Sequence, residues 1–461
     1  MQMSNYNKTP FFPLHESLCK GWDSIINKIN PEVKNSNRYV LVVECYQGVY
    51  HNELLEGFGR LNPDVLIKSE DAFYPEEKIR EITFPDVTDD AIFGYMTRLT
   101  YDKLLDPEKV EALREKINNA TGLVIVYGHA AAIIAEESDC LVYADMARWE
   151  IQLRQRKHEV NNIGLRNADE APGIQYKRGF FVDWRLCDKL KQQLFERADF
   201  WLDTNKANNP KMISAKTMLH GLSEVAKSPF RVVPYFDPGP WGGQWMKDVC
   251  GLDKTKPNFA WSFDGVPEEN SLLFKIDDEI FEIPSINLVF YKSKELLGEP
   301  VESRFGKEFP IRFDFLDTIG GGNLSLQVHP TTQYIRDTFG MNYTQDESYY
   351  MLDAKEDATV FLGLKTGIDS GEMIADLQKA QDTGETFEAE KYVNVFPAKK
   401  HDHFLIPNGT VHCSGINGMV LEISATPYIF TFKLYDWGRL GLDGEPRAIN
   451  IEHGSKVINW D

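Results

Sequence analysis

The chain has 461 residues, of which 42% are hydrophobic and 26% charged, and its formal net charge is -20 at pH 7. This length exceeds what one hydrophobic core supports and predicts two or three domains. The acidic excess argues against nucleic acid and anionic membranes as partners, although it does not exclude a small phosphorylated substrate. Without a long apolar run or a signal peptide at its start, the sequence predicts a cytoplasmic protein.

The first half alternates apolar strands with charge-rich helical stretches. Helices are expected at Asn52–Phe58 and Pro107–Asn118. The expected strands are Tyr39–Glu44, Val65–Lys68, Gly122–Tyr127 and Asp139–Ala144. Strands that alternate with helices favour parallel pairing, so this half is predicted to be an α/β domain with a doubly wound parallel sheet, over residues 1–228.

The second half changes to short strands separated by Gly, Pro and Asn turns. A helical insertion is expected at Ile368–Thr386. The expected strands include Ser271–Ile276, Ile286–Tyr291, Thr359–Leu364 and Met419–Ser424. Many short strands with frequent turns are typical of an antiparallel barrel, so residues 229–461 are predicted to form an all-β, jelly-roll domain.

Four side chains in this second half form a candidate metal site. Gln327 and His329 stand at i and i+2 in a strand-like run, so both side chains leave the same face. A Pro-Asn-Gly turn precedes His412, and Glu347 lies in another strand-like stretch. Two imidazoles, a carboxylate and an amide oxygen suit Zn²⁺ or a similar divalent ion with one position open for water or substrate.

Other interpretations of these residues stay open on the sequence alone. His329 could be an ordinary hydrogen-bonded histidine of a strand, and Glu347 an exposed carboxylate. Gln327 could contact a ligand side chain instead of the metal. His401 and His403 form a second i, i+2 pair and offer a rival site. The six cysteines contain no C-x-x-C pair, which argues against a disulfide framework and a thiolate zinc site.

The second half resembles the class I mannose-6-phosphate isomerases of the cupin superfamily. The resemblance covers roughly residues 234–461, and its strength lies in the order of the motifs. These are Pro240–Gly243, Gln327–Pro330, Glu347, Pro407–His412, and Leu434–Arg439 followed by Gly444–Arg447.

The resemblance implies a reversible conversion of mannose 6-phosphate to fructose 6-phosphate through a cis-enediol. It makes Gln327, His329, Glu347 and His412 the ligands of Zn²⁺, and a small phosphorylated sugar the partner. It also places Lys433 where relatives carry a substrate-facing or catalytic arginine.

Three positions depart from the family's pattern. Asp314 and Gln345 stand where relatives often carry lysines, and Lys433 replaces an arginine. A loss of cations weakens the binding of a phosphate dianion unless other basic side chains compensate. The candidates for compensation are Arg304, Arg312 and Arg439.

The first half resembles P-loop kinases such as uridine kinase and phosphoribulokinase. The resemblance rests on strand order, on Ser69–Tyr74, and on basic side chains within Asp145–Arg156. A working P-loop needs glycines, a Lys and a Ser or Thr, whereas Glu44–Asn52 supplies neither the Lys nor the hydroxyl. We therefore expect a degenerate domain with a regulatory, scaffolding or oligomerising role, or an unrelated α/β domain.

Three functions remain after these observations. The first is the metal-dependent isomerase, the second a non-catalytic metal-containing sensor of sugar phosphates, and the third an isomerase of a different, less charged sugar. The intact ligand set favours an enzyme, whereas Asp314 and Gln345 favour the sensor.

Overall fold

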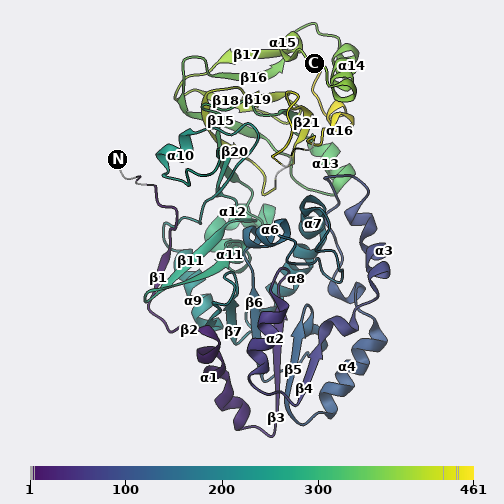
Figure 1. Cartoon of the computed structure of the whole chain (residues 1–461), viewed down its shortest axis with the longest axis vertical. Helices are drawn as coiled ribbons and strands as arrows, with labels where there is room; N and C mark the ends of the chain where they lie inside the picture. Colours follow the sequence, from purple (N-terminus) through teal and green to yellow (C-terminus); the bar gives the residue numbers. More distant parts are fainter. Residues whose placement is uncertain (1–3, 5, 429, 443, 445, 461) are drawn as a thin grey trace. The chain divides into compact units, whose positions relative to one another are not determined.

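The computed structural model describes residues 4, 6–428, 430–442, 444 and 446–460, and these form two compact units (Figure 1). The α/β unit comprises Phe11–Arg231 and Ser271–Lys307. The β unit comprises the described residues within Met1–Pro10, Val232–Asn270 and Glu308–Asp461.

The expected division was residues 1–228 and 229–461. The α/β unit instead begins at Phe11, and it includes the later segment Ser271–Lys307. The strand β1 (Phe12–Leu14) pairs in parallel with β11 (Ser271–Ile276), which continues into β12 (Glu279–Pro284). The chain therefore passes from Val232–Asn270 of the β unit back into the α/β unit, and it enters the β unit again at Glu308. A single boundary in the sequence cannot represent such a return.

A seven-stranded sheet forms the centre of the α/β unit. Across the sheet the order is β4 (Val65–Lys68), β5 (Gly122–Gly128), β3 (Arg38–Cys45), β6 (Cys140–Asp145), β7 (Phe200–Asp203), β8 (Lys211–Ser214) and β2 (Cys19–Lys20). The five strands from β4 to β7 are mutually parallel, the next strand β8 is antiparallel to them, and the edge strand β2 is antiparallel to β8. The α/β prediction is confirmed, whereas the likeness to P-loop kinases stays a prediction.

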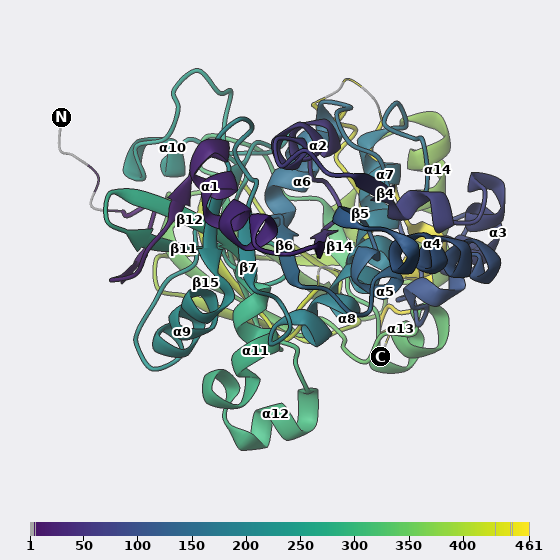
Figure 2. The same cartoon turned by 90° about the horizontal axis from the view of Figure 1, so that it is seen from below.

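Helices cover both faces of this sheet. Figure 2 shows α1 and α2 on one face and α5, α8 and α9 on the other. Because both faces are covered, β3 and β6 are buried along almost their whole length, which explains their continuous apolar sequences. The helices of this unit are α1 (Gly21–Lys34), α2 (His51–Gly59), α3 (Glu76–Val87), α4 (Pro107–Asn119), α5 (Ala131–Ile134), α6 (Arg148–Arg156), α7 (Pro172–Arg178), α8 (Trp184–Leu194), α9 (Ala215–Val225), α11 (Ile286–Leu297) and α12 (Glu299–Phe305).

The strand expected at Ile286–Tyr291 is wrong, because these residues begin helix α11. Five consecutive residues, from Ile286 to Phe290, are buried in this helix. A short apolar run that is buried on all sides has no periodicity that distinguishes a strand from a helix.

The β unit contains two antiparallel sheets, which confirms the all-β part of the fold prediction. The six-stranded sheet has the order β18 (His403–Ile406), β15 (Glu347–Ala354), β20 (Gly418–Ser424), β13 (Arg312–Asp317), β10 (Trp261–Gly265) and β9 (Tyr235–Asp237). The five-stranded sheet has the order β17 (Val393–Pro397), β16 (Thr359–Leu364), β19 (His412–Ser414), β14 (Leu326–Val328) and β21 (Phe432–Tyr435).

Short helices connect the strands of the β unit. The expected helical insertion is present as α14 (Ser370–Thr383). The others are α10 (Trp245–Val249), α13 (Thr332–Phe339), α15 (Ala389–Tyr392) and α16 (Ile451–Ser455). Among the described residues of the whole chain, no helix combines the length and the apolar character that crossing a membrane requires.

Candidate metal centre

Both sheets of the β unit contribute to one cluster of metal-binding side chains. His329 directly follows β14, His412 begins β19, and Glu347 begins β15 of the other sheet. Gln327 of β14 is the register partner of His412, so their side chains leave the same face of the five-stranded sheet. The expected i, i+2 relation of Gln327 and His329 therefore directs both toward the six-stranded sheet.

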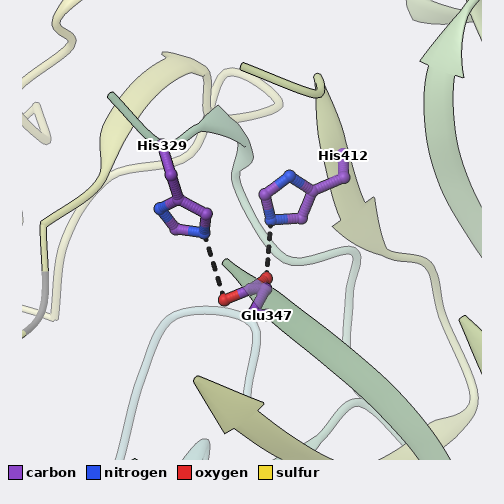
Figure 3. A group of neighbouring side chains, drawn as sticks. All are labelled: His329, Glu347 and His412. Carbon is purple, nitrogen blue, oxygen red and sulfur yellow. Dashed lines mark ion pairs between the residues drawn. The ribbon is translucent and has the colours of Figure 1, made fainter. Parts of the chain in front are cut away.

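His329, Glu347 and His412 each offer one ligand atom, and these three atoms lie within 4.8 Å of one another. Glu347 Oε2 is 3.1 Å from His329 Nε2, and Glu347 Oε1 is 2.8 Å from His412 Nε2 (Figure 3). The two histidines are fully buried, and Glu347 is 5% exposed. Within the described part of the chain, this is the one group of three such side chains close enough to share an ion.

The hydrogen bonds of the two imidazoles fit a cation at the centre of the cluster. His329 Nδ1 lies 3.0 Å from the carbonyl oxygen of Phe430, and His412 Nδ1 lies 2.8 Å from that of Thr410. Because a carbonyl only accepts, each Nδ1 carries the hydrogen, and Nε2 is the ring atom that each histidine directs toward Glu347. An Nε2 atom without a proton would present its lone pair to the carboxylate, and the two repel each other unless a cation lies between them.

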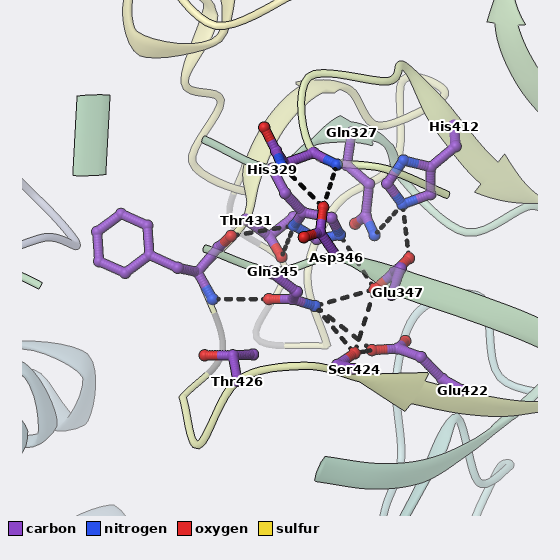
Figure 4. Close-up of polar contacts among 12 residues, drawn as sticks. Gln327, His329, Gln345, Asp346, Glu347, His412, Glu422, Ser424, Thr426 and Thr431 are labelled. Atoms are coloured by element: carbon purple, nitrogen blue, oxygen red, sulfur yellow. Dashed lines mark hydrogen bonds and ion pairs between the residues drawn. The ribbon is translucent and has the colours of Figure 1, made fainter. Parts of the chain in front are cut away.

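Gln327 is the fourth member of the cluster. Its side-chain amide lies 3.3 Å from His412 Nε2 (Figure 4). Rotation of the amide by half a turn exchanges its nitrogen and oxygen, and the oxygen is the atom that binds a metal. The structure thus brings together all four side chains that the sequence predicts as ligands.

A second layer of polar side chains holds Glu347 in place. Gln345 Nε2 donates to Glu347 Oε2 at 2.9 Å, and Gln345 Oε1 accepts from the backbone N–H of Phe430 at 3.0 Å. Ser424 Oγ lies 3.4 Å from the same carboxylate oxygen (Figure 4). Burial raises the pKa of Glu347, but the two histidines outweigh it and hold this pKa well below its usual range. Gln345 thus orients a ligand at a position where the resemblance leads one to expect a lysine.

Asp314 belongs to a buried ionic cluster on the inner face of the six-stranded sheet. Arg312 Nε is 3.2 Å from Asp314 Oδ1, and Arg312 Nη2 is 2.5 Å from Glu422 Oε1. All three residues are at most 4% exposed. Burial raises the pKa of Asp314 to about 6, and burial together with Asp314 and Glu347 raises the pKa of Glu422 well above its usual range. Two carboxylates therefore occupy the guanidinium of Arg312, one of the three arginines proposed to replace the missing lysines.

Lys433 lies on the other side of Gln327 from His412. It is the register partner of Gln327 on β21, so the three side chains follow one row across the five-stranded sheet. Burial, followed by repulsion from Arg447, lowers the pKa of Lys433 to about 8.

Asp436 joins two arginines near this lysine. Arg439 Nη2 is 2.5 Å and Arg447 Nη1 is 2.7 Å from its carboxylate. Two arginines thus share one carboxylate on the β21 side of the centre. Arg447 belongs to the closing motif, of which Glu445 lies outside the described residues.

The alternative ligands do not join this centre. His401 is exposed and its Nδ1 lies 2.7 Å from the hydroxyl of Tyr350, whereas His403 is exposed on β18. Neither belongs to a group of three ligand side chains within the described residues. Arg304 is exposed on α12 of the α/β unit.

Comparisons with known proteins match the first and the second half of the chain to different proteins. Residues 21–227 match a family described as a domain of unknown function, DUF8485. The chain is 26% identical over 240 residues to the probable mannose-6-phosphate isomerase GmuF of Bacillus subtilis, which covers 50% of this chain and 68% of that protein. It is also 26% identical over 220 residues to the mannose-6-phosphate isomerase of Streptococcus mutans, which covers 47% of this chain and 64% of that protein.

Among solved structures, the mannose 6-phosphate isomerase of Bacillus subtilis is similar with a TM-score of 0.42 and 21% identity, over 50% of this chain and 69% of that chain. The sequence matches fall on the C-terminal half, which contains the His329–Glu347–His412 cluster. The homologues of the C-terminal half of this chain are therefore mannose-6-phosphate isomerases.

Proposed function

We propose that the β unit is a metal-dependent aldose–ketose isomerase that interconverts mannose 6-phosphate and fructose 6-phosphate through a cis-enediol. The observation that carries this proposal is the convergence of His329, Glu347 and His412 from two sheets, with both Nδ1 atoms bound to carbonyls. The homology of this half of the chain to isomerases of that substrate supports it. The cytoplasmic location stays a prediction.

Gln327, His329, Glu347 and His412 would hold the ion, and Zn²⁺ suits this mixture of nitrogen and oxygen donors. When bound, the ion would polarise the carbonyl and the adjacent hydroxyl of the sugar and stabilise the negative charge that develops as the C2 proton moves. The chain's own contribution is to fix the ligands: the carbonyls of Phe430 and Thr410 orient the imidazoles, and Gln345 orients Glu347.

We propose Lys433 as a catalytic residue that faces the substrate. Its register position beside Gln327 in the same row of the sheet supports this role. Arg439 and Arg447 add positive charge next to Asp436, which supports binding of a phosphorylated sugar from this side. A lysine with a pKa of about 8 is able to hold or release a proton near neutral pH.

The direct test is a coupled assay of the purified chain with mannose 6-phosphate and detection of fructose 6-phosphate. We expect turnover that a chelator abolishes and that added Zn²⁺ restores, because the ion stabilises the developing charge. Full activity of the chelated, metal-free protein would contradict the proposal.

The buried cluster around Asp314 supports a second candidate, an isomerase of a less charged sugar. The cluster of Arg312, Asp314 and Glu422 offers carboxylates to the interior and leaves its guanidinium occupied. The same assay with unphosphorylated mannose separates the two: this candidate requires a higher kcat/KM for mannose than for mannose 6-phosphate. Bound metal without turnover of either sugar would instead indicate the non-catalytic sensor.

The pH dependence of the isomerase tests the role of Lys433. If the ammonium form is required, kcat/KM falls as the pH rises through about 8, because the lysine loses its proton there. Lys433→Arg keeps the charge to a much higher pH and moves this decline upward. Lys433→Met lowers kcat/KM at all pH values and removes the decline. A profile that is the same in all three proteins would rule out Lys433 as the titrating group.

For the α/β unit we retain the proposal of a degenerate, P-loop kinase-like domain without phosphoryl transfer. The end of β3 supports the loss of phosphate binding, since the buried carboxyl group of Glu44 in this strand already accepts from the backbone N–H groups of Ala130 and Ala132, each at 2.8 Å. These donors at the start of α5 are thereby occupied by the chain's own carboxyl group.

A further inference from the structure

A cavity of about 880 Å³ lies within the α/β unit, where the parallel strands β3, β4 and β5 end. Residues after each of these strands line it, among them Gly48, Glu70 and His129. Open parallel sheets bind ligands in crevices at the carboxyl ends of their strands. The volume falls in the range of sites for small molecules.

The charge of the cavity wall is unfavourable for phosphate. Five carboxylates belong to lining residues: Glu70, Asp71, Glu76, Glu77 and Glu159. Against them stand two basic side chains, Lys68 and Arg166. Because the acidic side chains prevail, a phosphorylated ligand would meet net repulsion. Ligands with hydroxyl donors, in contrast, find acceptors in these carboxylates.

Asp71 is the clearest of these acceptors. Its carboxylate has no hydrogen bond or ion pair with any of the described residues, whereas Glu76 pairs with Arg80 and Glu159 accepts from the hydroxyl of Tyr50. An exposed carboxylate at the mouth of a cavity is free to accept from a ligand at little cost.

Two imidazoles add further polar atoms. His129 Nδ1 lies 2.9 Å from the carbonyl oxygen of Cys45 and so carries the hydrogen, which leaves Nε2 of a neutral ring as an acceptor. His51 Nδ1 lies 2.6 Å from the hydroxyl of Tyr127. Nε2 of His51 is a donor when Tyr127 donates to Nδ1, and an acceptor when Nδ1 of a neutral ring donates to Tyr127. The two rings stand edge to face with centroids 5.3 Å apart.

Aromatic side chains supply the apolar part of the wall. Tyr50, Phe73 and Tyr74 line the same cavity. Aromatic faces pack against the C–H groups of a sugar ring, while carboxylates and imidazoles bind its hydroxyls. Together these groups match a flat, hydroxyl-rich molecule without charge.

We propose that this cavity binds a small uncharged polyhydroxylated ring, the chemistry shared by a free monosaccharide and the ribose of a nucleoside. The inference is independent of the proposed isomerase activity, because every residue that carries it belongs to the α/β unit.

The test is a titration of the full-length chain with mannose, fructose and uridine, each compared with its monophosphate, by calorimetry and ligand-observed NMR. A chelator is present throughout, and the titrations are repeated with His329→Ala, so that binding at the metal centre does not contribute. We expect at least one uncharged ligand to bind, and its monophosphate to bind at least about tenfold more weakly. Binding of mannose or fructose would identify a monosaccharide site, and binding of uridine a nucleoside site.

Two variants locate the binding. Asp71→Ala and His129→Phe are each expected to weaken it about tenfold, because each removes an acceptor for a ligand hydroxyl. Glu115→Gln, an exposed substitution on α4 outside the cavity wall, leaves it unchanged. The proposal is overturned if no uncharged ligand binds at millimolar concentration, if the monophosphates bind more tightly, or if both variants bind as the unmodified chain does.

Discussion

Replacement of His412 by alanine is expected to remove the bound metal and to lower kcat/KM by more than about a hundredfold, since even residues behind metal ligands contribute up to that much. His412 supplies one of two imidazoles to the centre and lies 2.8 Å from Glu347. Without it, the buried Glu347 loses its nearest partner and the ion loses a nitrogen ligand. Metal content by mass spectrometry and the coupled isomerase assay measure both effects on the same preparation.

His401→Ala is the matched control for this variant. His401 is an exposed histidine of the same unit, in the i, i+2 pair that offered the rival site. We expect its replacement to leave metal content and activity unchanged. The opposite result, with metal lost from His401→Ala and retained in His412→Ala, would move the centre to the pair of His401 and His403.

Replacement of Arg312 by methionine is expected to destabilise the β unit by about 3 to 5 kcal/mol, the usual cost of leaving buried charges without a partner. Arg312 faces Asp314 and Glu422, and all three are buried. Methionine preserves much of the volume but removes the positive charge between the two carboxylates. Urea unfolding curves of the variant and the unmodified chain give the difference.

The destabilisation should depend on pH in a defined direction. Burial already raises the pKa of Asp314 to about 6, and loss of Arg312 raises the pKa of both carboxyls further. A folded-state pKa above the unfolded value makes stability fall as the pH rises, so the variant is most destabilised at alkaline pH.

Two further variants separate charge from packing at Arg312. The double variant Arg312→Met, Glu422→Gln should recover part of the loss at alkaline pH, where Glu422 loses its proton, because one buried charge fewer is then left unpaired. Lys400→Met, which removes an exposed charge of the same unit, should change stability by less than about 0.5 kcal/mol. An Arg312→Met protein as stable as the unmodified chain at alkaline pH would show that the cluster is not ionised as described.

Local patterns predicted most of the fold because they determine which faces are buried. The strands at 39–44, 65–68, 122–127 and 139–144 are all present, since long apolar runs between turn residues fit a covered parallel sheet. The helix at Ile286–Leu297 was missed because its first turns are buried on every side. The return of β11 to the α/β unit depends on pairing with β1, a contact between distant segments that no local pattern contains.

The candidate ligands were predictable for a related reason. The period of two along a strand places Gln327 and His329 on one face, and the order of the motifs identified Glu347 and His412. The surroundings were harder to predict. In the sequence, Gln345 stands where the resemblance predicts a lysine, whereas in the structure its side chain orients Glu347. Glu422 and Ser424 repeat the i, i+2 spacing on β20, a signal that becomes meaningful only once β20 is known to pair with β15.

Side chains from two sheets of the β unit converge on one position, where we expect a single divalent ion. Anomalous diffraction from crystals of the Zn²⁺-loaded chain would locate this ion. We predict a single strong peak about 2.0 to 2.3 Å from His329 Nε2, His412 Nε2 and a carboxylate oxygen of Glu347. A peak bound instead by His401 and His403, or no peak between His329 and His412 in a zinc-loaded crystal, would contradict the account.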